Sequence, residues 1–394
     1  MRKAYAAVVA LAGLALAGCS TTVAGTAVED PSAVPRPDTG TYPTTPRQVG
    51  PPSADMALAL EGRRMAETAP RISDIDSAIR YGGSRFAAGR LIAGPSSVRS
   101  TFGPVADGAL DRRELGFLMG ASNVHSGGAV DPNVKNRAVT AGVFRMPDGA
   151  AAAAAVTPRL RDKDSASTPD RNPVDIPGYS AAIAYTADYK LMNQDPSTVA
   201  FLAYKQYVIA VYGNWSPDQV RAYFDRQTKG LDGFTPTPLD KVAQLPMDEA
   251  GVAKYTLAPP QSDPTRDGSM PATVALLGQS DLIASKKDFD EAGVDVVGQG
   301  SNTVYRARDA AGATRLKDAF IAETNSAYGE KQPVTATGVP GSACLRLSPY
   351  PGSDSRFTYC VVAVGRYLAE VSAVQQNQAF QALGAGYLML KDAQ

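Results

Sequence analysis

The sequence has few of the residues on which most catalytic sites depend. Its 394 residues include one histidine, three cysteines and one tryptophan. The lone histidine, His125, excludes zinc sites that need two or three histidines, and with them the HExxH motif of metalloproteases. G-x-S-x-G and S-x-x-K patterns are missing, and the glycine pairs at 298/300 and 384/386 lack the other residues of a phosphate-binding loop. We therefore expect no enzyme, and no catalytic, cofactor-binding or metal-binding residue.

An excess of one charge is missing as well. Lys and Arg together number 39, and so do Asp and Glu. Proteins that bind nucleic acid carry a basic face that dominates their affinity, so we expect no nucleic-acid partner. Hydrophobic residues make up 44% of the chain and charged residues 20%, which is typical of a folded globular protein. The length favours two domains.

Long apolar runs are missing except for one near the N-terminus, over 4–16, which follows Met1-Arg-Lys. It is too short to cross a bilayer, which needs about 20 apolar residues. The run ends in Leu16-Ala17-Gly18-Cys19, which resembles the lipobox of bacterial lipoproteins. The resemblance implies that 1–18 is a signal peptide and that Cys19 carries lipid, which anchors the protein to the cell membrane facing the extracytoplasmic envelope space. The other interpretation is a soluble secreted protein whose leader happens to end in cysteine.

The segment that begins at the cysteine, 19–55, is rich in Pro, Thr, Ser and Gly. Such a composition cannot bury enough apolar surface to fold by itself. We therefore expect a semi-extended tether between the lipid and the globular body. As polyproline II its fully extended limit is roughly 100 Å.

The two remaining cysteines, Cys344 and Cys360, would lie in a compartment that permits disulfides. Both occur in strand-like sequence, and a turn-forming stretch at 348–355 separates them. We predict a disulfide between the two strands of a hairpin, worth about 3 kcal/mol on the chain-entropy model. Two reduced buried thiols are the alternative, and the wide spacing argues against a redox or metal role.

A polar, Pro-rich stretch at 259–271 is typical of a linker between domains, and it separates the expected domains at 56–258 and 272–394. The two halves share a pattern. Val143-Phe-Arg-Met-Pro-Asp148 matches Val304-Tyr-Arg-Ala-Arg-Asp309, and 203–211 matches 363–371, with an offset of about 160 throughout. The constant offset indicates a duplicated unit. The first-unit positions that correspond to Cys344 and Cys360 are roughly Ile183 and Ala200.

Each unit is expected to contain a strand, a helix, several strands and a closing helix. Apolar or alternating runs at 181–185, 199–204 and 207–212 predict strands. Ser216-Pro217 predicts a helix start, and the second closing helix has an apolar face made by Phe380, Leu383, Tyr387 and Leu390. The predicted fold class is therefore α+β: two tandem related units, each a mainly antiparallel sheet with helices packed on one face.

Several segments carry a resemblance to a known family: Cys19-Ser-Thr-Thr-Val-Ala-Gly, Glu61-Gly-Arg-Arg-Met-Ala66, Phe234-Thr-Pro-Thr-Pro238, and Cys360 with Gly365-Arg-Tyr-Leu-Ala369. With these, the chain resembles an uncharacterised family of two-domain lipoproteins from mycobacteria, nocardiae and their relatives. The resemblance covers nearly the whole chain. It implies attachment to the outer leaflet of the cell membrane, and it brings no assigned activity.

A few side chains leave a chemical role open. His125 with Ser122 or Ser126 has the composition of a serine hydrolase site, although a loop histidine without a role is the simpler interpretation. The carboxylate pairs Asp162/Asp164 and Asp288/Asp290 have the groups for calcium binding or acid–base chemistry. Both pairs lie in charged stretches that are typical of solvated loops.

Aromatic residues gather on and after a predicted hairpin, at Tyr204, Tyr207, Tyr212 and Trp215. They could line a sugar- or lipid-binding face, but packing in a core or at its rim is the commoner role. We expect a non-enzymatic binding or scaffold module whose partner is an envelope protein, glycan or lipid. The alternatives are a carrier or sensor of an apolar or glycolipid ligand, which a deep apolar cavity would favour, and a serine hydrolase.

Overall fold

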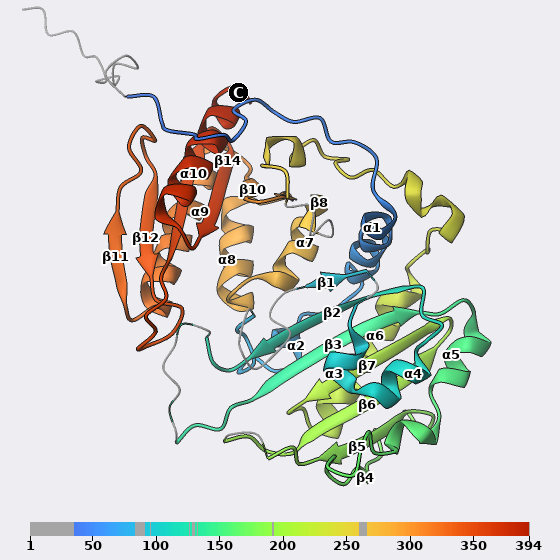
Figure 1. Cartoon of the computed structure of the whole chain (residues 1–394). Coiled ribbons are helices and arrows are strands. Elements are labelled where there is room, and N and C mark those ends of the chain that lie inside the picture. Colours follow the sequence, from blue (N-terminus) through green and yellow to red (C-terminus); the bar gives the residue numbers. More distant parts are fainter. Residues whose placement is uncertain are drawn as a thin grey trace, which may run out of the picture. The chain divides into compact units, whose positions relative to one another are not determined.

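The computed structural model describes residues 35–82, 91–94, 96–125, 127, 131, 133–190, 193–259 and 266–393. The expected signal peptide, Cys19 and the first part of the expected tether lie outside the described residues. The described part contains two sheets of seven strands each, the first formed by β1 to β7 and the second by β8 to β14 (Figure 1).

The first sheet has the strand order β1-β2-β3-β7-β6-β5-β4, and all its neighbouring strands are antiparallel. Its strands are β1 (Ile92–Ala93), β2 (Leu115–Ser122), β3 (Ala138–Arg145), β4 (Asn172–Pro173), β5 (Ile183–Ala187), β6 (Ser197–Tyr204) and β7 (Tyr207–Gly213). The helices of this half are α1 (Ala54–Ala66), α2 (Ile72–Ile75), α3 (Val98–Phe102), α4 (Pro104–Ala109), α5 (Gly149–Ala155) and α6 (Pro217–Asp232).

The second sheet has the order β11-β12-β13-β14-β10-β9-β8 and is also antiparallel. Its strands are β8 (Gly268–Pro271), β9 (Val296–Gln299), β10 (Thr303–Arg306), β11 (Lys331–Val334), β12 (Ala343–Leu347), β13 (Phe357–Val364) and β14 (Tyr367–Ala373). The helices are α7 (Ala272–Ala275), α8 (Leu282–Ala292), α9 (Ala310–Ala327) and α10 (Gln376–Lys391).

The two sheets repeat one topology, which confirms the predicted duplication and the α+β class. Read from opposite ends, the orders coincide strand for strand, with β1 corresponding to β8 and β7 to β14. Helix starts are repeated too. The Asp148 side chain accepts a hydrogen bond from the Ala151 amide at the start of α5, and Asp309 accepts one from Gly312 at the start of α9. Both units therefore begin their first helix with the same cap.

Helices cover both faces of each sheet, whereas the sequence predicted one covered face. Val220 and Phe224 of α6 pack with Ile209 of β7, while Ala152 of α5 packs with Val208 on the other face. The central strands explain the difference, because every residue of β2 and β3 is buried. Strands buried on both faces read as continuous apolar runs and need a cover on each side.

The predicted disulfide is present and joins directly opposed residues of β12 and β13. Cys344 pairs with Cys360 across the strands, with their Cα atoms 4.1 Å apart. In the first sheet the equivalent cross-strand pair is Ala184 and Ala200. The sequence alignment placed Ile183 there, one residue too early. That slip matters because neighbouring strand residues point to opposite faces.

The C-terminal portion of the expected tether lies on the C-terminal domain, and the portion before Pro35 lies outside the described residues. Pro37 is buried against Gly384 of α10, where a side chain at 384 would approach the Pro37 Cβ to 2.9 Å. The Asp38 carboxylate accepts a hydrogen bond from the Gln381 amide at 2.8 Å, and the hydroxyl of Tyr42 accepts one from Gln378 at 3.2 Å. We call residues 36–49 the strap.

The strap then continues to α1, so a segment without a core of its own has docked on another core (Figure 1). Near its end Arg47 forms an ion pair with Asp267 and donates to the Thr256 carbonyl at 3.1 Å. A Pro-rich composition excludes self-folding, but it does not exclude packing on a neighbouring surface. Composition alone therefore predicted that residues 36–49 belong to a tether, whereas these residues pack on the C-terminal domain.

The boundary between the domains differs from the expected linker at both ends. Val252, Tyr255 and Leu257 belong to the apolar core of the second domain, although they fall within 56–258. Gly268–Pro271, at the end of the expected linker 259–271, forms the edge strand β8. A polar, Pro-rich composition does not distinguish a free linker from an edge strand, where proline is tolerated.

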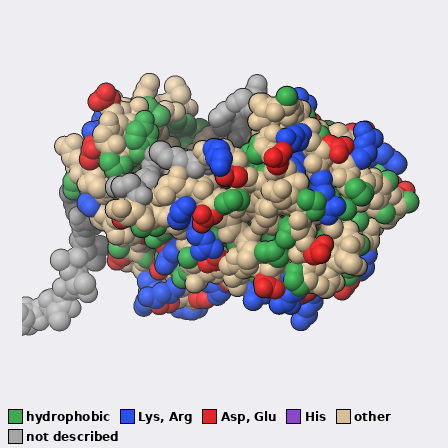
Figure 2. Space-filling model, turned by 90° about the horizontal axis from the view of Figure 1, so that it is seen from below, with side chains coloured by type: hydrophobic (Ala, Val, Ile, Leu, Met, Phe, Trp, Pro, Cys, Tyr) green, Lys and Arg blue, Asp and Glu red, His purple; other side chains and the backbone are tan. Residues whose placement is uncertain are grey.

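The surface carries both charges without a dominant sign. Figure 2 shows Lys and Arg side chains interspersed with Asp and Glu over the face seen from below, with hydrophobic side chains in small groups between them. This is the mixed surface that the balanced composition predicts.

Candidate functional site

A row of polar side chains crosses three neighbouring strands of the second sheet. Thr303 of β10 lies opposite Gln299 of β9 on one side and Glu370 of β14 on the other. Directly opposed residues point to the same face, which is otherwise apolar and carries Val297 and Leu368. The three polar side chains are half-buried. We call Gln299, Thr303 and Glu370 the polar row.

The polar row has an apolar counterpart in the first sheet. Gly142 of β3 lies opposite Leu118 of β2 and Ala210 of β7, in the same topological positions. Leu118 and Ala210 are buried in the core beneath α3, α4 and α5. The two units thus share their backbone pairing, and the corresponding positions are apolar in the first unit and polar and partly exposed in the second.

The row forms the floor of a groove of about 960 Å³. Residues of both domains line it: Arg63 of α1, Leu91, Ile92 and Ala93 from the first domain, and Gln279, Ser280, Gln299, Ser301, Thr303, Tyr305, Tyr328, Glu370, Ser372 and Gln378 from the second. The charged side chains Glu370 and Arg63 of the lining already form hydrogen bonds within the protein. The Tyr305 hydroxyl donates to Glu370 at 2.6 Å, and Arg63 donates to the Asp267 carbonyl at 2.5 Å.

Two smaller hollows continue from the groove. One of about 140 Å³ shares Tyr328, Glu370 and Ser372 with it. The next, of about 350 Å³, shares His125 and Glu323 with the first hollow. We call the three together the interdomain crevice, since side chains of both domains line it.

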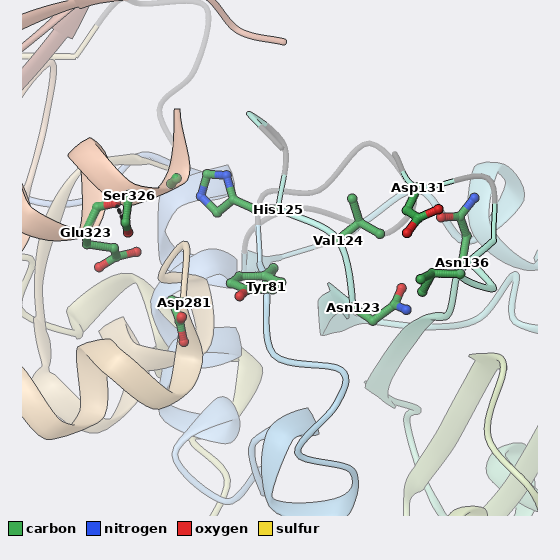
Figure 3. A pocket seen from close by; sticks show the side chains of 11 residues that line it. Tyr81, Asn123, Val124, His125, Asp131, Asn136, Asp281, Glu323 and Ser326 are labelled. Carbon is green, nitrogen blue, oxygen red and sulfur yellow. Dashed lines mark hydrogen bonds between the residues drawn. The ribbon is translucent and has the colours of Figure 1, made fainter. Parts of the chain in front are cut away.

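The far end of the crevice is drawn in Figure 3. Glu323 and Ser326 of α9 lie on one side of this pocket, and residues of the first domain lie on the other. His125 reaches between them, and its ring makes edge contacts with Tyr81 and Tyr328 at centroid distances of 5.6 and 5.3 Å. Tyr81 and His125 of the first domain and Tyr328 of the second therefore form an aromatic wall of the crevice.

The carboxyl of Glu323 lies close enough to other carboxylates to feel their charge. Within the described part of the chain it has no hydrogen bond or ion pair, while Arg80 is engaged in a two-point ion pair with Asp281 at 2.9 and 2.6 Å. Burial, reinforced by the charges of Asp281, Asp288 and Glu370, raises the pKa of Glu323 to about 8. At neutral pH this carboxyl therefore keeps its proton and can donate a hydrogen bond.

His125 does not form the predicted pair with a serine in the described residues. Its Nδ1 accepts a hydrogen bond from the Gly127 amide at 3.0 Å, and burial lowers its pKa. The Ser122 hydroxyl donates to the Val124 carbonyl at 2.7 Å. Ser126 lies outside the described residues.

The carboxylate pairs are not brought together as sites. Asp164 forms an ion pair with Arg171 and accepts from the Val105 amide at 2.9 Å, and Asp290 forms an ion pair with Lys286. Asp162 meets Arg171 only through its backbone carbonyl, which accepts a hydrogen bond at 2.5 Å, and its carboxylate is not part of that ion pair. In the described ranges no three His, Cys, Asp or Glu side chains gather as a metal site would require.

The aromatic cluster predicted as a possible binding face is packed instead. Trp215 and Tyr207 are buried in the core, and Tyr204 donates its hydroxyl to Asp232 at 2.5 Å. Tyr212 contacts the ring of Tyr189 with centroids 5.8 Å apart. Core and rim packing, the commoner role of such residues, accounts for them.

Two of the segments that carried the family resemblance meet in one buried network. Glu61 of α1 is fully buried, and its carboxylate accepts from the Thr237 amide at 2.7 Å. It also pairs with Arg64 at 2.6 Å and lies 3.7 Å from Arg145. The Arg64 guanidinium stacks over Phe234 at 5.6 Å. The contacts of Glu61 with Thr237 and of Arg64 with Phe234 therefore hold α1 to the segment that follows α6.

Comparison with protein families shows to which family the chain belongs. Residues 49–247 match the N-terminal domain of a family described as a domain of unknown function, DUF7373, and residues 252–393 match its C-terminal domain. The chain belongs to the DUF7373 family. No curated protein and no solved structure matches it. The boundary between the two DUF7373 domains lies just before the segment that enters the second core.

The polar row is the part of the crevice that sequence reasoning missed. A signal was present, because Thr303, Glu370 and Ser372 alternate with Val304, Ala369 and Val371 in their strands. Such alternation reads as an ordinary solvent-facing side of a sheet. The order of the strands in the sheet brings Gln299 into line with Thr303 and Glu370. Residues of the first domain then enclose the row from the other side of the groove.

Proposed function

We propose that this DUF7373 protein is a lipid-anchored, non-enzymatic binding module of the cell envelope that holds its ligand in the interdomain crevice. The observation that carries the proposal is the contrast between the polar row and its buried counterpart Leu118–Gly142–Ala210. A sheet face that the fold can fill with a core is instead polar and accessible. Polar groups converging in a cleft between domains are typical of ligand sites.

The anchor part of the proposal rests on the Leu16-Ala17-Gly18-Cys19 sequence. No helix in the described part of the chain is long and apolar enough to cross a membrane. Pro37, which contacts α10, lies 18 residues after Cys19. In polyproline II these 18 steps reach roughly 55 Å, about half the limit expected for the whole Pro-rich segment.

The lining favours a binding module for a polar ligand over a carrier of an apolar one. The described hollows contain carboxylate, amide and hydroxyl groups together with apolar side chains. An apolar ligand would strip water from these groups without replacing their hydrogen bonds, at a cost of about 1–3 kcal/mol for each group. A serine hydrolase is less favoured still, because Ser122 is bonded to backbone rather than to His125.

Photo-crosslinking in the producing cell tests the binding role. A photoreactive amino acid is placed at Ser372, which is exposed and lines the crevice, and in a matched variant at Tyr350, exposed in the turn between β12 and β13. We expect a saturable adduct from position 372 and much less from position 350. No adduct, or equal adducts from both positions, would contradict the proposal.

The anchor is tested separately by intact-mass measurement of protein extracted from membranes. We expect a chain that begins at Cys19 and carries the added mass of a thioether-linked diacylglyceryl group. A C19A variant is expected to leave the membrane fraction. An unmodified Cys19, or a retained leader, would refute the anchor without bearing on the crevice.

A further inference from the structure

We propose that the ligand of the interdomain crevice is a neutral glycan, bound with its sugar rings along the polar row and beside Tyr328. This inference rests on the binding role proposed above and names the chemistry of its ligand. It follows from four properties of the lining, which are its charge, its hydrogen-bonding groups, its aromatic wall and its position on the sheet face.

Charge argues for a neutral ligand. The groove contains the basic residues Arg63 and Arg266 and the acidic residue Glu370, so neither sign dominates. Arg63 is committed to the Asp267 carbonyl, and Glu370 to the Tyr305 hydroxyl. At the adjoining hollow Glu323 is protonated at neutral pH. A strongly anionic ligand would meet Glu370 and a strongly cationic one would meet the two arginines, so neither kind is favoured along the whole groove.

Hydrogen-bonding groups argue for a ligand rich in hydroxyls. The groups of the lining are mainly amides and hydroxyls, which both donate and accept: Gln279, Ser280, Gln299, Ser301, Thr303, Ser372 and Gln378. Three of them already donate a hydrogen bond within the protein, Gln279 to the Ala275 carbonyl, Ser301 to the Ala258 carbonyl and Gln378 to the Tyr42 hydroxyl, and each still has an acceptor oxygen. A sugar hydroxyl also does both, so each can satisfy two such groups at once. The protonated carboxyl of Glu323 extends this character into the adjoining hollow.

The aromatic wall supplies the apolar contact that sugar rings need. Tyr328 lines both the groove and the adjoining hollow. Contacts with His125 and Phe357, at centroid distances of 5.3 and 5.7 Å, hold its ring in place. The C–H face of a sugar packs against a fixed aromatic ring while its hydroxyls point to the polar row. The groove volume of about 960 Å³ lies within the range of small-molecule sites.

Position on the sheet distinguishes a glycan on the polar row from a peptide at a strand edge. An extended peptide binds a sheet by adding a strand at its edge, through main-chain hydrogen bonds. The polar row instead crosses the face of three strands that are already paired on both sides. The edge strands β1 and β8 also line the groove, through Ile92, Ala93 and Met270, and the peptide probe used below tests whether a peptide binds at these edges instead.

Binding by the full-length lipidated protein, held in a detergent without a sugar headgroup, tests the inference. The probes are neutral mannan, arabinogalactan and glucan oligosaccharides, with polygalacturonate and chitosan as charged comparisons and an unstructured neutral peptide as the peptide probe. Calorimetry measures the affinity. We expect saturable binding of at least one neutral oligosaccharide, and at least tenfold weaker binding of the other probes.

Two groove variants and one matched control locate that binding. Q299L/T303V removes the amide and the hydroxyl of the polar row without changing charge. S372Y fills the groove at an exposed position with the residue that the first unit has in the corresponding place, Tyr212. Each is expected to weaken binding at least tenfold. Q332L/T335V makes the same two changes at exposed positions outside the crevice and is expected to bind as the wild type does.

Thermal unfolding is measured for each variant, and S372Y provides the test if Q299L/T303V does not fold. Three results would overturn the glycan inference: no neutral oligosaccharide binds, binding is unchanged by both groove variants, or only a charged polymer or the peptide binds. Failure of the two proposals can be told apart. A crosslinked protein at position 372 together with no glycan binding retains the binding role and refutes the glycan, whereas no adduct at all refutes the binding role.

Discussion

Replacing Glu323 by glutamine is expected to make the stability of the protein less dependent on pH. In the unfolded chain the carboxyl loses its proton near the ordinary pKa of 4.5, whereas in the folded protein burial raises the pKa to about 8. Between these values the folded protein holds a proton that the unfolded chain has lost. The free energy of unfolding therefore falls as pH rises through this window and levels off above pH 8.

The magnitude follows from the shift. One pKa unit corresponds to about 1.4 kcal/mol, so a rise from 4.5 to about 8 corresponds to a limit of about 5 kcal/mol. Water entering the crevice and movement of neighbouring side chains reduce this limit, and we expect about 2–4 kcal/mol. The neutral amide of E323Q cannot ionise, so the variant does not lose this part of the free energy of unfolding as pH rises. The variant is therefore expected to be more stable than the wild type at pH 8 and similar to it at pH 4.5.

Chemical denaturation at intervals between pH 4.5 and 9 measures the difference. E291Q, a change of the same kind at an exposed helical position, is the control and is expected to follow the wild type. Parallel pH curves for wild type and E323Q would refute the reasoning, because they would mean that the Glu323 carboxyl is not held protonated by the fold. A difference that grows toward low pH would reverse its sign and refute it equally.

Further changes test the parts that hold the fold together. E61A removes the acceptor of the Thr237 amide and leaves Arg145 with Glu114 as its carboxylate neighbour, and we expect a loss of about 1–3 kcal/mol in denaturant unfolding; a loss below 1 kcal/mol would contradict the structural role of this network. Reduction of the bond between Cys344 and Cys360 is expected to lower the stability of the second domain by about 3 kcal/mol, measured as a shift in its thermal midpoint. Trypsin is expected to spare the bond after Arg47 in the wild type and to cut it in D267N, where the ion pair is lost; rapid cleavage of the wild type there would contradict the docked strap.

Sequence patterns predicted the repeated parts of the fold because these depend on local signals. Asp148 and Asp309 cap equivalent helices, and the offset between the halves keeps Cys344 in register with Ala184. A one-residue error in that alignment was enough to assign the wrong face. Local patterns therefore predicted the helices and strands well, but they predicted less well which face of a sheet each residue occupies.

Features that depend on packing between distant segments could not be predicted in the same way. The strap has the composition of a free tether, and only the surface of α10 makes it a bound segment. The second helical layer on each sheet follows from which residues are buried, which composition alone does not specify. The crevice requires two domains and a strand order, so no single stretch of sequence contained its signal.

The docked strap also determines where mechanical load enters the protein. If the lipid on Cys19 is held in the membrane and a partner pulls on the body, tension reaches the fold first at Pro37 and α10, before it can reach α1. The contacts of Asp38, Tyr42 and Arg47 would then have to peel away in turn. With such an anchor, the C-terminal domain, which also holds the disulfide, would be the half that bears the pull.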